Sequence, residues 1–151
     1  MVIETIGKVW KRLPPRARTW LTWRTQRKFT ASVAALVTNE RGEILLLNHV
    51  LRPKSGWGLP GGFVGYGEQP EAALRRELKE ETGLELSDVS LYRVRMLKRH
   101  VEIIFLAKGI GNAEVKSREI IGLAWFEVEN MPVEMNLDQQ FLIRKILRPE
   151  V

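Results

Sequence analysis

The sequence predicts an α+β domain, a sheet with helices on its faces, preceded by a basic helical arm. Five short apolar runs rich in strand-forming residues follow position 28, and two further segments have the spacing of amphipathic helices. A third observation sets the arm apart, because the excess positive charge lies almost entirely at the start of the chain. The length of 151 residues suits one such domain with a hydrophobic core. We therefore divide the chain into an arm, residues 1–28, and a domain, residues 29–151.

The arm is basic and rich in tryptophan. Residues 1–30 contain eight Lys and Arg against one acidic residue, a net charge of +7, whereas the rest of the chain contains 16 against 17, a net charge of −1. The prolines at 14 and 15 predict a break between two helical pieces. Trp10, Trp20 and Trp23 prefer burial, so we favour their packing on the domain or in a homodimer through the arm. An anionic membrane surface or an RNA 5′ end would also suit such a segment.

Composition excludes several classes of protein. The chain has no cysteine, which excludes disulfides and thiolate metal sites and fits a reducing compartment. No uninterrupted apolar run approaches the roughly 20 residues that span a bilayer. The basic residues Lys8, Lys11 and Arg12 are not followed by the apolar segment of a secretory signal. We therefore expect a cytoplasmic protein.

The first half of the domain is predicted to form a buried hairpin and a loop. Residues 29–37 and 43–50 are mostly apolar and are joined by a turn-forming segment at 39–42. Residues 51–62 are rich in proline and glycine, which predicts a loop that approaches another part of the molecule closely.

A helix over residues 69–82 follows. Pro70 suits its first turn and Gly83 its C-terminal stop. The remaining elements are three strands and a C-terminal helix, predicted for residues 90–97, 101–109, 119–128 and 137–147.

Three glutamates lie close together on the predicted helix 69–82. On a helical wheel of roughly 100° per residue, Glu81 and Glu77 border the apolar stripe of Leu74 and Leu78, and Glu80 lies further around. A solvated acidic face explains this poorly, because like charges four residues apart repel, and more so when partly desolvated. A divalent cation such as Mg²⁺ would turn this repulsion into a net attraction, since it prefers oxygen ligands and commonly bridges carboxylates and substrate phosphates.

The glutamates belong to a longer motif. Gly62, Glu68 and the run from Arg76 to Leu84 fit the pattern G-x5-E-x7-R-E-U-x-E-E-x-G-U, in which U is aliphatic, at every defined position. The chain thereby resembles the Nudix hydrolases. The resemblance implies the Nudix fold, a mixed β-sheet sandwiched between α-helices. It also implies an Mg²⁺-dependent enzyme, Mn²⁺ being the alternative ion, that hydrolyses the diphosphate linkage of nucleoside diphosphate derivatives.

The same resemblance implies the roles of individual residues. Glu77, Glu80 and Glu81 match the metal ligands of the family, together with the backbone carbonyl of Gly61. Arg76 matches the residue that orients the helix glutamates. A further acid outside the motif often completes such sites as a ligand or general base. Glu119 has a suitable placement, six residues before Trp125, although a solvated loop acid would look the same. The catalytic set implied is Glu77, Glu80, Arg76 and Glu119.

Substrate-binding residues are expected in the loop before the motif and on a later strand. Arg52 and Lys54 could meet phosphates and Trp57 could stack on a base, loop packing being the alternative. Arg95 could touch an anionic substrate, although exposed strand charges are common. His49 and His100 lack metal-ligand spacing, and we interpret both as structural.

The subgroup signatures of the family narrow the substrate. Arg99 stands where a proline would resemble ADP-ribose specificity, and residues 100–102 lack the tyrosine that would resemble dinucleoside polyphosphate specificity. A small nucleotide, with a nucleoside triphosphate favoured, is the remaining substrate class. The alternative function is a catalytically silent module of the same fold that binds a nucleotide or RNA.

Overall fold

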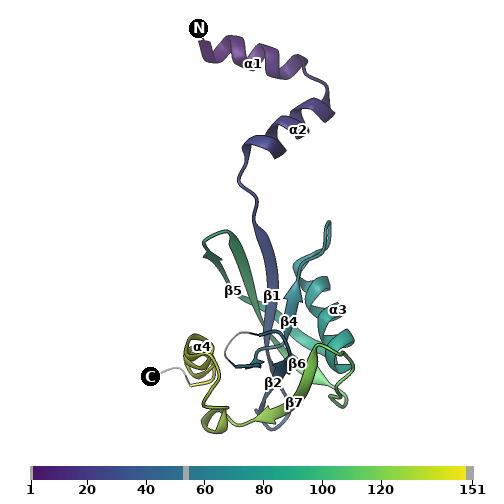
Figure 1. Cartoon of the computed structure of the whole chain (residues 1–151), viewed down its shortest axis with the longest axis vertical. Coiled ribbons are helices and arrows are strands. Elements are labelled where there is room, and N and C mark those ends of the chain that lie inside the picture. Colours follow the sequence, from purple (N-terminus) through teal and green to yellow (C-terminus); the bar gives the residue numbers. More distant parts are fainter. Residues whose placement is uncertain (1, 53–54, 149–151) are drawn as a thin grey trace.

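The computed structural model describes residues 2–52 and 55–148 and confirms the predicted α+β architecture. A seven-stranded mixed sheet carries α3 on one face and α4 on the other, and two further helices, α1 and α2, precede it (Figure 1). The elements are α1 (Val2–Arg12), α2 (Pro15–Thr25), β1 (Thr30–Thr38), β2 (Ile44–His49), β3 (Trp57–Gly58), β4 (Gly61–Phe63), α3 (Pro70–Thr82), β5 (Glu85–Leu97), β6 (His100–Ile110), β7 (Ile120–Phe126), a 3₁₀ turn (Val128–Asn130) and α4 (Leu137–Leu147).

Strand β1 is the centre of the sheet. It pairs in parallel with β6 along its whole length, from Thr30 opposite His100 to Thr38 opposite Lys108, and antiparallel with β2 and β4. Strand β2 continues the sheet to β3 and β7, and β6 continues it to β5, all antiparallel. The parallel pair among antiparallel ones makes the sheet mixed, as the family resemblance implies.

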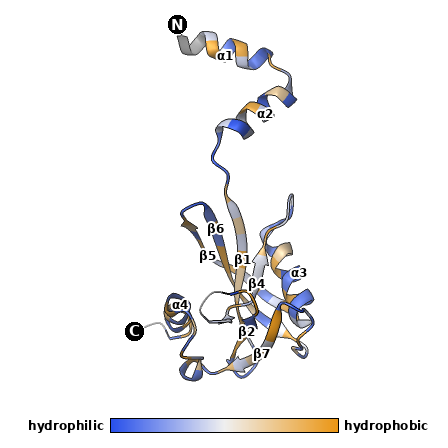
Figure 2. Cartoon of the chain, in the orientation of Figure 1, coloured by the Kyte–Doolittle hydropathy of each residue, from blue (hydrophilic) through white to orange (hydrophobic). Residues whose placement is uncertain are grey.

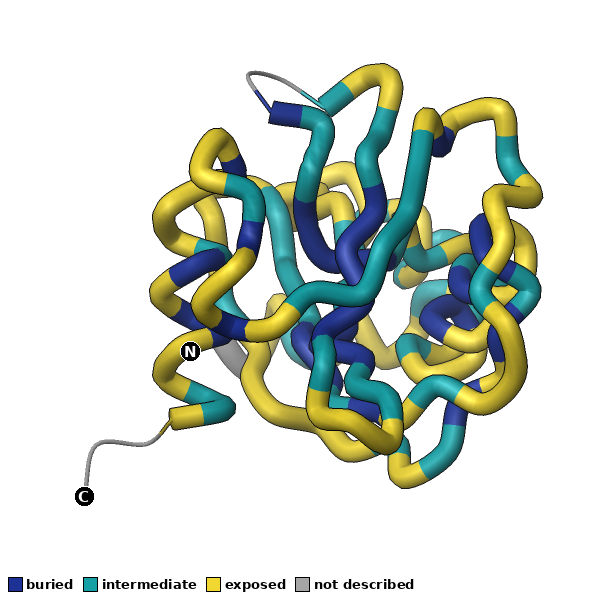
Figure 3. The backbone as a smooth tube through the Cα atoms, turned by 90° about the horizontal axis from the view of Figure 1, so that it is seen from below, coloured by how far each residue is buried: buried dark blue, intermediate teal, exposed yellow. Residues whose placement is uncertain are grey.

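Alternation along β1 divides the core between the two faces. Val33, Ala35 and Val37 are buried on the side of α3, and Leu36 on the side of α4, because successive side chains of a strand point to opposite faces. Buried segments accordingly run through the middle of the domain in Figure 3. The residues that α3 and α4 contribute to these two cores are Ala73, Leu74, Leu78, Leu142 and Ile143.

Local signals fixed the ends of α3 as predicted. The helix begins at Pro70 and ends at Thr82, and it is capped by Gly83, which has φ +73° and donates its N–H to the carbonyl of Lys79. Only a residue that tolerates the left-handed region closes a helix in this way without strain.

The loop predicted at 51–62 and the strand predicted at 90–97 differ from the structure. The loop contains the short strands β3 and β4. β4 brings Gly61 so close to β1 that a Cβ on it would lie 2.1 Å from the carbonyl oxygen of Val33. The close approach expected of this loop is therefore to β1. β5 begins at Glu85, five residues earlier than predicted, because an irregularity around Asp88, with φ +50°, interrupts the apolar alternation there.

Helices α1 and α2 stand clear of the sheet (Figures 1 and 2). The break at Pro14 is as predicted, but Trp10, Trp20 and Trp23 are 40%, 55% and 61% exposed. Within one chain the tryptophans therefore do not pack on the domain, which was one of the two forms of packing that we expected. A homodimer through the arm stays a prediction. In the part of the chain that the structure describes, no helix combines the length and apolarity needed to cross a membrane.

The two faces of α4 predict opposite effects of truncation. Ile143 is fully buried, so Ile143→Ala should lower the free energy of unfolding by about 2–5 kcal/mol. Phe141 on the same helix is 70% exposed, and Phe141→Ala should change it by less than about 0.5 kcal/mol. Urea denaturation of both variants measures this difference, and equal destabilisation would contradict the placement of α4.

Candidate active site

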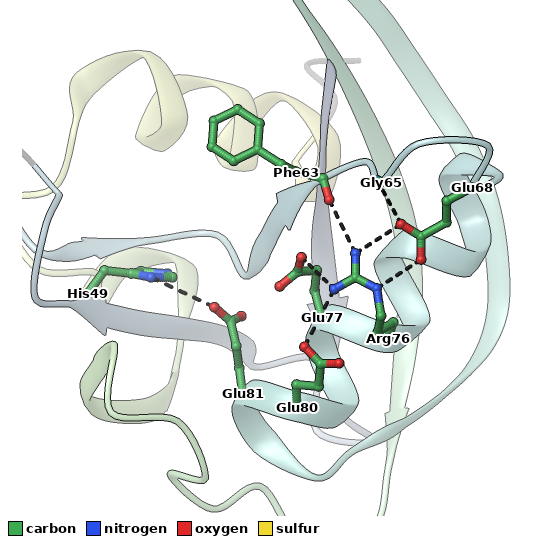
Figure 4. Close-up of polar contacts among 8 residues, drawn as sticks. All are labelled: His49, Phe63, Gly65, Glu68, Arg76, Glu77, Glu80 and Glu81. Carbon is green, nitrogen blue, oxygen red and sulfur yellow. Dashed lines mark hydrogen bonds and ion pairs between the residues drawn. The ribbon is translucent and has the colours of Figure 1, made fainter. Parts of the chain in front are cut away.

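Helix α3 presents its three glutamates at three depths. The side chain of Glu81 is 8% exposed, that of Glu77 18% and that of Glu80 61%. This order follows their angular distance from the apolar stripe of Leu74 and Leu78. Figure 4 shows the three carboxylates on one side of the helix, with His49 facing Glu81 and Arg76 facing the other two.

Glu81 is a buried carboxylate that lacks full compensation. Burial, the charge of Glu77 and the charge of Glu119 raise its pKa to about 7, against the opposing effects of the Gly61 backbone and Arg52. Its Oε2 is buried and has no hydrogen-bond partner among the residues that the structure describes. A buried, unpaired carboxylate oxygen is costly unless a proton or a cation satisfies it.

His49 lies beside this carboxylate, with Nδ1 3.9 Å from Oε1 of Glu81. Burial and the charge of Arg52 lower the pKa of His49 to about 4, so the ring is neutral at pH 7. No spacing in the sequence marked His49 as part of a site, because packing of β2 against α3 creates the proximity. His100 has the structural role we expected, since its ring nitrogens lie 2.7 Å from the hydroxyls of Thr30 and Ser32.

Arg76 ties the outer glutamates to the loop before the helix. Its Nε and Nη2 donate to the carboxylate of Glu68 at 2.8 and 2.9 Å, and Nη2 also donates to the carbonyl of Phe63 at 3.2 Å. Nη1 lies 2.8 Å from Oε1 of Glu77 and 3.5 Å from Oε2 of Glu80.

The contact with Arg76 and a backbone hydrogen bond from Gly65 lower the pKa of Glu68 to about 2. Glu68 thus has Arg76 as its direct partner. A guanidinium anchored at two points fixes the direction in which Glu77 points.

Glycine at position 62 makes room for Glu77. A Cβ there would lie 2.3 Å from Cδ of Glu77, so the carboxylate rests directly against the backbone of β4. The next residue back, Gly61, contacts Glu81 through its backbone. The two glycines therefore bring main-chain polar groups and two carboxylates together.

The donor set suits a hard divalent cation. Glu77, Glu80, Glu81 and the carbonyl of Gly61 offer only oxygens, which Mg²⁺ and Mn²⁺ prefer. Glu81 has a free oxygen for such an ion, whereas Glu77 and Glu80 share Arg76. As the side chains are placed, the described residues contain no cluster of three metal-ligating side chains. Arg76 contacts Oε1 of Glu77 and Oε2 of Glu80, so an ion bound by these residues would use their other oxygens.

A cavity of about 410 Å³ adjoins the site. Arg52 connects the two, because it lines the cavity and its charge acts on both Glu81 and His49. Arg95 also lines it and forms an ion pair with Glu102. The sequence did not indicate the polar residues that the start of α4 contributes, since only the tertiary fold brings them here: Asn136, Asp138 and Gln139.

The other expected residues are placed differently. Trp57 packs edge-to-face on Phe126, with ring centroids 5.2 Å apart, which is the packing alternative. Lys54 lies outside the described residues. Glu119 is exposed just before β7, and its backbone carbonyl accepts a hydrogen bond from the N–H of Val50, 2.9 Å away. Its charge is among those that raise the pKa of Glu81.

Glu81→Gln should stabilise the metal-free protein. A carboxyl whose folded pKa is raised from 4.5 to about 7 weakens the fold progressively as pH rises through that range, and fully above it. At pH 8 the variant should gain up to about 3 kcal/mol in free energy of unfolding, and near pH 4 nothing. Urea denaturation in chelator at both pH values measures this, with the exposed Glu71→Gln on α3 as control. Equal stability of wild type and Glu81→Gln at pH 8 would contradict it.

Comparison with known proteins places this site in a family. A family model for the NUDIX domain matches residues 28–147. A MutT-like protein of Streptomyces ambofaciens is 30% identical over 109 residues, covering 70% of this chain and 69% of that protein. An ADP-ribose pyrophosphatase of Methanocaldococcus jannaschii is 33% identical over 119 residues, covering 74% and 70%.

A solved structure agrees. The crystal structure of a MutT NUDIX hydrolase from Burkholderia pseudomallei superimposes with a TM-score of 0.69 at 26% identity, covering 80% of this chain and 99% of that one. The match includes the motif from Gly62 to Leu84 and the strands that surround it. The chain belongs to the Nudix hydrolase family.

Proposed function

We propose that the protein is an Mg²⁺-dependent hydrolase of the diphosphate linkage in a small nucleotide, with a nucleoside triphosphate favoured. One observation carries the proposal: the buried oxygen of Glu81 that has no hydrogen-bond partner among the described residues, next to Glu77 and to an arginine that lines a cavity. A bound cation would stabilise a carboxylate that is buried in this way.

Each residue has a part in this proposal. Mg²⁺, when bound by Glu77, Glu80, Glu81 and the Gly61 carbonyl, would neutralise phosphate oxygens and help to make a water nucleophilic. Arg76 positions Glu77 through its anchor on Glu68. Glu119, whose charge already acts on Glu81, is the candidate for the general base. Neutral His49 excludes water on the buried side of Glu81.

The cavity supports a nucleotide as the substrate. Its volume of about 410 Å³ falls within the usual range for small-molecule sites. Arg52 and Arg95 both line the cavity, where their positive charge would favour phosphates, and Arg95 is paired with Glu102. The amides and carboxylate of Asn136, Asp138 and Gln139 offer donors and acceptors that suit the edge of a base.

The names of the relatives do not agree on one substrate, so the choice of substrate is argued from the residues of this chain. One is named an ADP-ribose pyrophosphatase and another MutT-like. Arg99, at the position where proline resembles ADP-ribose specificity, favours a triphosphate over ADP-ribose.

A second function has one observation in its favour. Arg76 already occupies one oxygen of Glu77 and approaches Glu80. If that pairing persists with ligand, the protein is a catalytically silent module that binds a nucleotide or RNA.

Glu81→Gln should abolish turnover. We expect wild type to release phosphate or pyrophosphate from at least one member of a panel of nucleoside triphosphates, ADP-ribose and dinucleoside polyphosphates with Mg²⁺. The variant should be at least about 100-fold slower, because it loses an anionic ligand. Glu71→Gln, an exposed change on the same helix, should retain full activity. Equal turnover by Glu81→Gln would remove Glu81 from the ligand set. A wild type inactive on every substrate would favour the silent module.

Gly62→Ala should impair activity without unfolding the protein. The three atoms nearest to the added methyl group all belong to the flexible end of Glu77, so we expect it to displace the carboxylate and leave the sheet intact. We expect a drop of about 10–100-fold in kcat/KM and an unchanged melting temperature. Gly122→Ala in β7, where a Cβ meets nothing within 4 Å, is the matched control. Full activity of Gly62→Ala would argue against Glu77 as a positioned ligand.

A further inference from the structure

Helix α1 has an apolar face that the described residues of this chain leave largely exposed. Ile6, Val9 and Trp10 follow the spacing i, i+3, i+4, which places them along one side of the helix. Ile6 is 62% exposed and Val9 57%, and Figure 2 shows this helix banded in apolar and polar colours well away from the domain. A stripe of this kind usually has a partner.

The opposite face of α1 is cationic. Lys8, Lys11 and Arg12 lie away from the apolar stripe, and all three are exposed. They belong to the segment with net charge +7, whereas the rest of the chain carries −1 and offers little counter-charge. The arm is thus both amphipathic and strongly basic.

Helix α2 adds aromatic groups paired with cations. Trp20 and Trp23 lie one turn apart and are more than half exposed. The guanidinium of Arg24 lies 5.6 Å from the Trp20 ring centroid, and Nζ of Lys28 lies 3.5 Å from that of Trp23. Indole rings with adjacent cations are typical of segments at the boundary between lipid and water.

We infer that residues 1–28 bind an anionic lipid surface, with α1 in the headgroup region and its apolar face toward the acyl chains. An aliphatic stripe would not contribute to RNA binding, which uses only the cations and the aromatic rings. A second copy of the chain is disfavoured, because two arms of +7 repel each other. An anionic membrane can bury the apolar stripe and attract the basic residues at the same time.

The arrangement of the chain permits this binding without blocking the site on α3. The extended residues 26–29 separate α2 from β1, and both arm helices lie beyond one end of the sheet (Figure 1). The arm can therefore lie on a surface without covering the cavity that Arg52 lines (Figure 1). Recruitment would place the enzyme near a membrane without changing its chemistry.

Vesicle co-sedimentation of the full chain tests the inference. The protein should bind vesicles of phosphatidylcholine with phosphatidylserine and not vesicles of phosphatidylcholine alone, and binding should weaken as salt is raised. Lys11→Glu and Ile6→Ser should each reduce the partition coefficient at least about 5-fold, since the first reverses a charge and the second removes part of the stripe.

The controls separate lipid from other partners. Arg41→Glu makes the same charge change in an exposed turn of the domain and should leave vesicle binding as in wild type. Equal losses of vesicle binding for Lys11→Glu and Arg41→Glu would overturn the inference, as would vesicle binding that Ile6→Ser leaves unchanged. So would arm-dependent binding of single-stranded RNA without vesicle binding, or a dimer in light scattering that Ile6→Ser dissociates.

Discussion

Helix α3 packs on β1 through Leu74 and Leu78, and the same side of the helix carries Glu81 into the interior. Burial of the two leucines contributes about 1.5–3 kcal/mol each, comparable to the roughly 3 kcal/mol that the raised pKa of Glu81 implies as a cost. The fold therefore keeps the carboxylate of Glu81 buried, although its ionised form would be more stable in water. The arrangement of the site follows from this constraint, because the Gly61 backbone, Arg52 and His49 all lie within its electrostatic reach.

The outer part of the site depends on a different restraint. Glu77 and Glu80 are more accessible, and without support their side chains would sample many rotamers. Arg76, fixed by the carboxylate of Glu68 and the carbonyl of Phe63, limits that freedom. Gly62 sets how near Glu77 can come to the strand. One glutamate is thus placed by burial and another by a hydrogen-bonded guanidinium.

Sequence predicted what depends on neighbours along the chain. The ends of α3 and α4, the break at Pro14 and the graded burial of Glu81, Glu77 and Glu80 follow from caps, breakers and helical periodicity. Contacts between residues far apart in the chain could not be predicted from the sequence. These include the contact of His49 with Glu81 and the part of the cavity formed by Asn136, Asp138 and Gln139. The short β4 was also missed, because it is held by pairing with β1 and its glycines have no strand preference of their own.

The parallel pairing of β1 with β6 has a consequence for how the chain is made. Each residue of β1 meets a partner 70 positions further along, such as Thr30 with His100. A ribosome releases β1 long before β6 exists, so the central strand, with Val33, Leu36 and Val37, waits with unpaired backbone and uncovered apolar side chains. The elements made before β6 that can shield β1 are its antiparallel partners β2 and β4 and the helix α3. Slow, late closure of the sheet makes β1 the segment most in need of protection from aggregation during synthesis.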